Sequence, residues 1–363
     1  MNAMNAITIP RDLREDWRWA NLPTLEAAAV APSADTGVDI PAQFLDLDGP
    51  RLTFVDGQFE PAHSRPGKVA VERLSLDTAH PLGARAMGEG WSLTLGDEHA
   101  IGPVQIVHVS TGGENHLPAR IVLAKDAVAE VVETYVGHGW ANRLTQITLG
   151  EGARLMRSVR LLQSDGFVSI RDEAEVGKAA SLVSIFLGAG GMGTRIDGAI
   201  RVTGEGGFAE MGGALLTSGD QRQEAAVALR HEAEYGTSKQ IWRAVAADRS
   251  TASLAARVEV ARGAQKTDGE QSLRGLLLKR TATINLKPEL EIFADDVKCA
   301  HGATVGELDK RAMFYLQSRG IEEARATALM TRAFVADAID RIGDETVRAA
   351  FAADAESWLE RAL

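Results

Sequence analysis

Residues 288–320 read PELEIFADDVKCAHGATVGELDKRAMFYLQSRG, and this stretch passes from a strand-like to a helix-like pattern. Between positions 284 and 294 every even-numbered residue is apolar, whereas the odd-numbered residues before Phe293 are polar or charged. A period of two is typical of a β-strand that buries one face. The sequence therefore predicts a strand whose buried face carries Ile284, Leu286, Pro288, Leu290, Ile292 and Ala294.

Cys299, the single cysteine of the chain, and His301 follow this strand. Residues two apart in a strand share a face, with their Cα atoms roughly 7 Å apart. If the register continues through the Asp295-Asp296 pair, Cys299 and His301 point away from the core of the strand. The same register would bury Asp296 and Lys298, so a break in the register stays open as the alternative.

Two motifs close the stretch, Cys-x-His-Gly-Ala-Thr and Phe-Tyr-Leu-x-Ser-Arg-Gly-Ile. In these residues the chain closely resembles the SufB/SufD core proteins of the SUF iron–sulfur cluster assembly system, and within that family it looks most like the SufD members. A fainter similarity reaches back to about Arg14 and includes the Trp-containing segment 15–19. The longer helical segment that usually precedes this Trp motif in the family is nearly absent here.

The resemblance implies a fold, a set of partners and a site. The fold is a right-handed parallel β-helix core, and the partners are a SufB-like paralogue and a SufC-like ATPase, which hydrolyses the ATP. By the same resemblance, His301 and Cys299 belong to a site at the interface with SufB, where a transient Fe–S cluster forms. The helical end of the chain, with Phe314, Tyr315 and Arg319, corresponds to the region that docks SufC. The chain itself is then a scaffold subunit and not an enzyme, and no cofactor is expected to bind stably to it alone.

The number of possible cluster ligands in the chain also indicates that a second subunit is needed, independently of the resemblance. Iron–sulfur clusters usually take four protein ligands, mostly thiolates. This chain offers one thiolate, one nearby imidazole and Asp295. It cannot complete a conventional cluster site by itself, so cluster chemistry on this chain requires a second subunit.

Composition sets the class of protein and its compartment. The 363 residues are 45% hydrophobic and 25% charged, which is ordinary for a globular protein. The net charge of -11 argues against nucleic-acid binding as the main function. One cysteine suits a reducing compartment, and neither a signal peptide nor an apolar run long enough for a membrane helix is recognisable. We therefore expect a cytoplasmic protein.

The pattern divides the chain into three parts. Residues 1–86 form an N-terminal region with a charged, aromatic stretch at 11–19, a short helix near 25–31 and a hairpin at 51–59, where Asp56-Gly57 supplies the turn. Residues 87–304 hold many short strands without crossover helices, which indicates an all-β stack, sandwich or solenoid. Residues 305–363 are helical, with helices expected up to Gly320, over 322–342 and over 345–363. Thr304 and Glu307 read as a capping box for the first of them.

Motifs of other functions are incomplete. Residues 188–193, GAGGMG, match the dinucleotide-binding pattern, but a strand-like segment follows where that pattern requires a helix, so we interpret the glycines as a turn. No phosphate-binding loop of the Walker type occurs, and His231-Glu232 lacks the second histidine of a zinc-protease helix, which makes His231 an ordinary strand residue.

Two further functions remain as alternatives at this point. A carbohydrate-active β-helix enzyme is compatible with the all-β centre, although such enzymes are usually exported and rich in aromatic residues. A self-associating structural protein is the other. A homodimer of the isolated chain stays open for the SufD-like scaffold itself. Turnover of a polysaccharide by the isolated chain would favour the enzyme, and co-purification with an ATPase separates the assembly scaffold from the structural protein.

Overall fold

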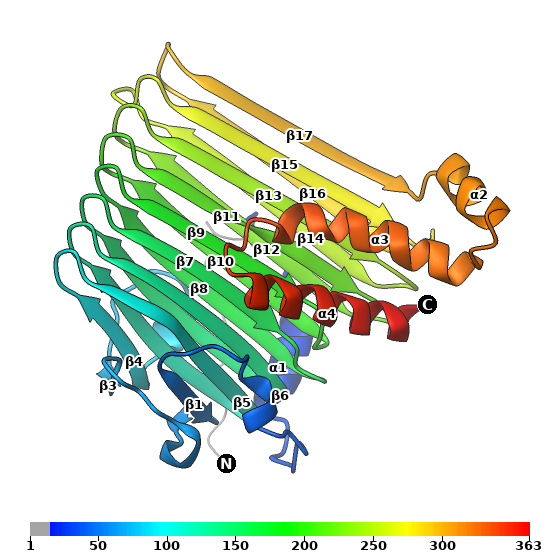
Figure 1. The fold of residues 1–363 in the computed structure, drawn as a ribbon, viewed down its shortest axis with the longest axis horizontal. Coiled ribbons are helices and arrows are strands. Elements are labelled where there is room, and N and C mark those ends of the chain that lie inside the picture. Colours follow the sequence, from blue (N-terminus) through cyan, green and yellow to red (C-terminus); the bar gives the residue numbers. More distant parts are fainter. Residues whose placement is uncertain (1–14) are drawn as a thin grey trace.

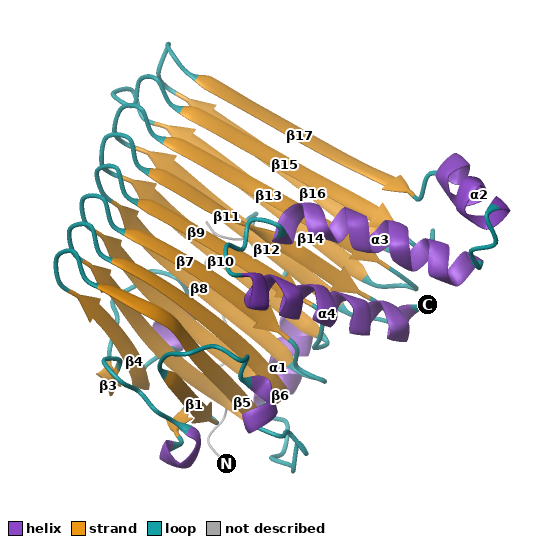
Figure 2. Cartoon of the chain, viewed as in Figure 1, coloured by secondary structure: helices purple, strands orange, loops and turns teal. Residues whose placement is uncertain are grey.

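Two stacks of parallel strands, wound as consecutive turns of one solenoid, form the centre of the molecule (Figures 1 and 2). The computed structural model describes residues 15–363, so positions 11–14 of the expected N-terminal stretch lie outside the described residues. The solenoid has about eight turns. The prediction of a mainly β chain with a parallel β-helix core and a helical end is confirmed.

One stack forms the helix-covered face, named for the helices that lie across it in Figure 1. Each of its strands after β7 pairs in parallel with the strand two before it in the chain. Its members are β7 (Arg154–Leu161), β9 (Ser181–Gly188), β11 (Phe208–Thr217), β13 (Thr237–Ala246), β15 (Asp268–Leu277) and β17 (Lys298–Glu307).

The other stack forms the opposite face and follows the same pairing rule. Its members are β8 (Phe167–Val176), β10 (Gly193–Val202), β12 (Arg222–His231), β14 (Thr251–Val260) and β16 (Thr283–Ile292). Side chains alternate between the interior of the solenoid and its outer surface, as the period of two requires. In β16 the expected even positions, Ile284 to Ile292, stand in register with buried residues of β14, which confirms that they share the inward face. Their predicted burial is wrong, because no further strand covers β16: Ile284 to Leu290 are partly exposed and Ile292 is 41% exposed.

The glycine-rich segment 188–193 lies between β9 and β10, so its interpretation as a turn between strands is confirmed. His231 is the last residue of β12 and is buried, as expected of a strand residue.

Antiparallel pairs close the N-terminal end of the solenoid. The long strands β5 (Ala100–Leu123) and β6 (Val128–Leu149) each contribute to both faces, and β5 carries β1 (Arg51–Val55) and β4 (Gly88–Leu95) on its outer edge. β2 (Gln58–Phe59) pairs with β1 in the predicted hairpin, whose turn residues Asp56 and Gly57 have φ of 50° and 75°. β3 (Ala70–Leu74) pairs with β4 in the same antiparallel sense.

Helices cover parts of the outside. α1 (Leu22–Ala29) packs near the N-terminal turns, while α3 (Glu323–Ile339) and α4 (Glu345–Ala362) lie across the helix-covered face (Figure 1). Their apolar side chains, including Val335, Phe351 and Trp358, pack on outward residues of β9, β11 and β13. Ion pairs between Arg160 and Asp354 (2.6 Å) and between Arg341 and Glu210 (3.0 Å) join the same layers. α3 and α4 are therefore attached to the solenoid by both apolar contacts and ion pairs.

The first C-terminal helix differs from its prediction. α2 spans Lys310–Ser318, and Asp309 caps it by accepting from the backbone N–H groups of Arg311 and Ala312. The capping box of Thr304 and Glu307 is wrong, because both residues lie in β17 and Glu307 instead forms an ion pair with Arg280 (2.7 Å). Strand pairing with β15 extends the sheet three residues beyond the expected boundary.

Candidate functional site

The C-terminal end of the solenoid is open. β16 pairs only with β14 and β17 only with β15 among the described strands, so the outer edges of both have no neighbour in this chain. Interior side chains of these last rungs are consequently partly exposed, including Leu286 and Leu290, and Val305 is 45% exposed. Unpaired strand edges with apolar side chains are a surface on which another chain can pair.

Cys299 and His301 lie on β17 within this open end. They share a face, and their register partners in β15 are Gly269 and Gln271, which are both buried. The two side chains are thus on the interior-facing side of the last rung, and the expectation from an unbroken register, that they point away from the core, is wrong. The physical reason is that the chain turns at residues 293–297 and crosses to the other stack, which resets the alternation.

The same turn leaves the acidic pair outside the site. Ala294 is buried there, whereas Asp295 and Asp296 are exposed and Asp296 pairs with Lys266. Among the described residues, no group of three or more His, Cys, Asp or Glu side chains is arranged to hold a metal ion.

Cys299 is half-buried and packs beside Val258, Val260, Ala264 and Ala294. A Cβ added to Gly269 would lie 3.5 Å from the Cys299 sulfur, so the glycine leaves space directly beneath the thiol. Burial raises the pKa of the Cys299 thiol, and a hydrogen bond from the Gly269 backbone offsets only part of that rise. Cys299 is a thiol at neutral pH until a cation or metal ion favours the thiolate.

His301 is exposed and lies directly above Gln271 in the stack. An exposed imidazole can reach a neighbouring subunit, and it can bind a metal through a ring nitrogen. Gln271 did not emerge from the sequence as a site residue, because a buried glutamine 30 positions upstream carries no local signal.

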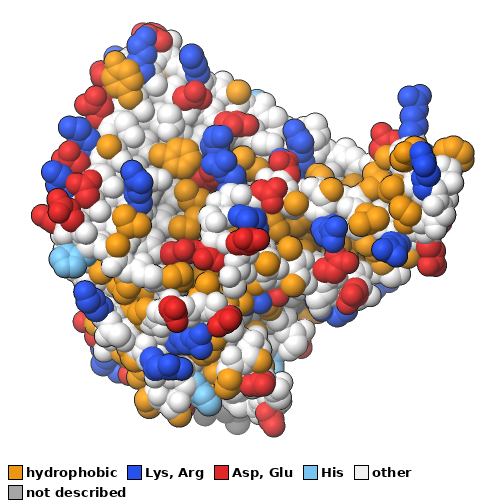
Figure 3. All heavy atoms as spheres, in the orientation of Figure 1, with side chains coloured by type: hydrophobic (Ala, Val, Ile, Leu, Met, Phe, Trp, Pro, Cys, Tyr) orange, Lys and Arg blue, Asp and Glu red, His pale blue; other side chains and the backbone are white. Residues whose placement is uncertain are grey.

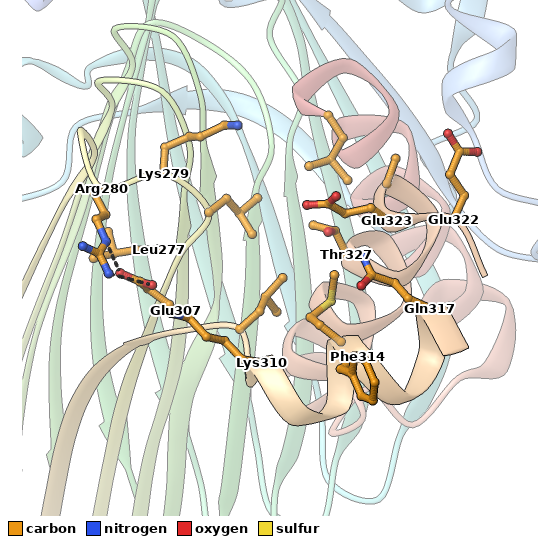
Figure 4. Close-up of a pocket in the computed structure, with 15 residues that line it drawn as sticks. Leu277, Lys279, Arg280, Glu307, Lys310, Phe314, Gln317, Glu322, Glu323 and Thr327 are labelled. Carbon is orange, nitrogen blue, oxygen red and sulfur yellow. Dashed lines mark hydrogen bonds and ion pairs between the residues drawn. The ribbon is translucent and has the colours of Figure 1, made fainter. Parts of the chain in front are cut away.

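A groove of about 780 Å³ lies between the end of the helix-covered face and the helices α2 and α3 (Figure 4). Arg280 and Glu307 line it from the solenoid side, and Phe314, Gln317 and Thr327 line it from the helices. Of the residues around this groove, only those of the Phe-Tyr-Leu motif had been singled out from the sequence.

α2 itself buries none of its residues, and Figure 3 shows hydrophobic side chains gathered at the protruding tip that it forms. Phe314 is 72% and Tyr315 57% exposed. Arg319 donates to the Tyr315 hydroxyl (3.2 Å) and lies over the Tyr315 ring. Exposed aromatic and arginine side chains that lie close together are typical of the residues that anchor protein interfaces. The structure thus places Phe314 and Tyr315 on α2 and Arg319 at its C-cap, where Arg319 contacts Tyr315.

Comparison with known proteins decides the family. The SufBD core domain of the SUF system for FeS cluster assembly matches residues 108–334. The chain belongs to the SufB/SufD family. Members of this family are iron–sulfur cluster assembly proteins, and the chain is SufD-like by similarity.

Three relatives show how far the similarity reaches. The iron–sulfur cluster assembly protein SufD of Escherichia coli is 26% identical over 94% of this chain and 87% of its own length. The chloroplast protein ABCI7 of Arabidopsis thaliana is 30% identical over 60% of this chain and 47% of its own. A SufBD family protein of Mycobacterium tuberculosis is 28% identical over 73% of this chain and 69% of its own. The similarity to the Escherichia coli protein therefore includes the N-terminal region and the helical end.

No helix in the described part of the chain combines the length and apolarity that crossing a bilayer requires.

Proposed function

We propose that this chain is the SufD-like scaffold subunit of a SufBCD-type assembly complex. It completes a nascent-cluster site at an interface with a SufB-like paralogue and docks a SufC-like ATPase. The observation that supports this most directly is the exposed imidazole of His301 beside the half-buried thiol of Cys299, on a strand whose outer edge is unpaired. The cluster is cargo of the complex and leaves it.

The need for a paralogue follows from the ligand count. One thiol and one imidazole leave about half of the usual four ligands to be supplied from outside. The edges of β16 and β17 offer backbone hydrogen-bonding groups to a further strand, and a related subunit with the same solenoid end has matching geometry. In this proposal His301 is a ligand and Cys299 either a second ligand or a neighbour that shapes the site.

α2 is the proposed docking element for the ATPase. Its exposed Phe314 and Tyr315 offer an apolar anchor, Arg319 adds a charge, and the groove behind α2 has room for a side chain of the partner. Because α2 follows β17 directly, a movement imposed on α2 reaches His301 through a single strand. The ATPase hydrolyses ATP in this proposal, and the present chain transmits the motion.

Other properties complete the proposal. The chain binds no cofactor stably when alone, works in the cytoplasm and forms a homodimer when its paralogue is missing. Membership in an iron–sulfur assembly family favours this role over a carbohydrate-active enzyme.

The experiment is cluster assembly in the complex reconstituted with the paralogue and the ATPase. His301→Ala should leave the complex intact and reduce the Fe–S absorbance formed on it to background. His99→Ala is the matched control, because His99 is exposed at the other end of the solenoid and should assemble clusters like the wild type. Full assembly in His301→Ala would refute the assignment. Affinity purification from the native cell, with the ATPase and paralogue as expected partners, tests the composition of the complex.

A further inference from the structure

Two glutamines lie in a column inside the solenoid, directly beneath His301. Gln240 of β13, Gln271 of β15 and His301 of β17 are successive register partners in the same stack. Gln240 is fully buried and Gln271 is 2% exposed. Paired Cα atoms on adjacent parallel strands are about 4.8 Å apart, so side chains in one column contact each other.

The hydrogen bonds of the two amides fix their orientation. Gln240 Nε2 donates to the backbone carbonyls of Val227 (3.2 Å) and Arg257 (3.4 Å) on the opposite face. Its Oε1 is therefore the end that accepts from Gln271 Nε2, at 2.7 Å. Gln271 Nε2 also donates to the carbonyl of Glu289 (3.3 Å), so its NH₂ group has two acceptors and the amide cannot be reversed without losing both.

One atom remains without a partner at the top of the column. Gln271 Oε1 is buried and accepts no hydrogen bond. A buried acceptor that stays unpaired is costly, so such atoms in a folded protein usually have a partner in the functional state. The next position in the column is His301, at the same spacing that already allows the hydrogen bond between Gln240 and Gln271.

We propose that Gln271 is a positioning residue for His301, accepting a hydrogen bond from one ring N–H through Oε1. An imidazole whose one nitrogen donates to a fixed acceptor is held in a single tautomer, and its other nitrogen presents a lone pair to a metal. The inference rests on the proposed function of His301 as a ligand, and it adds the group that sets which ring nitrogen is free. Gln240 and the two carbonyls hold that acceptor in place.

The tautomer of His301 in the full-length chain is the direct test. Ring ¹⁵N chemical shifts at a pH where the imidazole is neutral report the ratio of the two tautomers, and the signal is identified by its loss in His301→Ala. Gln271→Met removes the acceptor at similar length and should change the ratio about fivefold, which corresponds to about 1 kcal/mol for one hydrogen bond.

Gln223→Met is the matched control. Gln223 is also a buried glutamine with an unpartnered Oε1, but it lies on β12 of the opposite face, outside the column of His301. An unchanged ratio in Gln271→Met, or an equal change in Gln223→Met, overturns the proposal.

Cluster assembly in the reconstituted complex gives the second readout. Gln271→Met should reduce assembly about 10-fold to 100-fold, the usual cost of removing a residue that orients a histidine ligand, whereas Gln223→Met should not. If His301→Ala still assembles clusters, the proposed function of His301 fails. The tautomer ratio still tests the hydrogen bond between Gln271 and His301, because that measurement needs no cluster. If His301→Ala is inactive and Gln271→Met is fully active, only the positioning role fails.

Discussion

A buried arginine shared by two carboxylates makes the stability of this protein depend on pH in a way that one substitution can isolate. Arg195 contacts Asp197 through Nε (2.6 Å) and Glu224 through Nη1 (2.7 Å), and its guanidinium stacks on Trp17 at 3.8 Å from the ring centroid. Burial opposes ionisation of Asp197, but Arg195 and a hydrogen bond with His80 outweigh it and lower its pKa to about 2. Burial raises the pKa of Glu224 to about 7, and Arg195 compensates only part of this because Asp197 is so close.

The sign of the effect follows from linkage. The carboxyl of Glu224 keeps its proton to about pH 7 in the folded chain, compared with an ordinary pKa of 4.5. The folded state therefore binds more protons between these two values, and the free energy of unfolding falls as the pH rises from about 4.5 to about 7. Since a tenfold change in proton affinity corresponds to about 1.4 kcal/mol, the loss attributable to Glu224 is about 3 kcal/mol.

The assay is urea unfolding of wild type and Glu224→Gln at a series of pH values from 4.5 to 8.5. The amide keeps an oxygen that accepts from Arg195 but carries no charge. Glu224→Gln should therefore gain about 3 kcal/mol relative to wild type between pH 4.5 and 8, with most of the change below pH 7. Burial lowers the pKa of His108 and of His231 to about 4, so each of these groups makes the free energy of unfolding rise with pH over the same range. The difference in unfolding free energy between wild type and Glu224→Gln removes this contribution, because both proteins contain the two histidines.

Glu205→Gln, at an exposed turn, is the control and should differ from wild type by the same amount at every pH. Parallel pH profiles for wild type and Glu224→Gln, or a difference of the opposite sign, would show that the cluster does not hold Glu224 protonated.

Three further predictions concern the interfaces and the helical end. Val305→Lys, on the edge strand β17, places a charge on the partly exposed last rung and should weaken association with the paralogue at least tenfold in calorimetry. Undiminished association would exclude this edge from the interface. Phe314→Ala, on α2, should leave the melting temperature unchanged but weaken binding of the ATPase about tenfold. If the variant binds the ATPase as tightly as wild type does, another surface docks the ATPase. Phe351→Ala, in the fully buried layer between α4 and the solenoid, should cost about 3–5 kcal/mol in chemical unfolding, and a cost below about 1 kcal/mol would mean that this layer contributes little.

Local patterns located the elements of this fold well. The alternation at 284–292 specified which face of β16 points inward, because strand geometry makes every second residue point the same way. It did not show that this face is left partly exposed at the last turn. Asp56-Gly57 specified the hairpin, since both residues adopt the positive φ that its turn requires. The start of α2 was missed because pairing of β17 with β15 keeps Thr304 to Glu307 extended, and a tertiary interaction of that kind overrides a local capping pattern.

What the sequence by itself determined was which residues alternate, which cluster into helices, and that a single thiol with a nearby imidazole is too small a set for a cluster. Only the tertiary structure decided what lies next to those residues: that Cys299 and His301 face the interior column, that Gln240 and Gln271 lie beneath His301, and that Trp17 covers Arg195. The physical reason is that periodicity fixes the direction of a side chain within its own strand. The neighbour stacked on it, by contrast, depends on the length of every turn of the solenoid, and partners 31 residues apart, such as Gln240 and Gln271, leave no trace in local sequence.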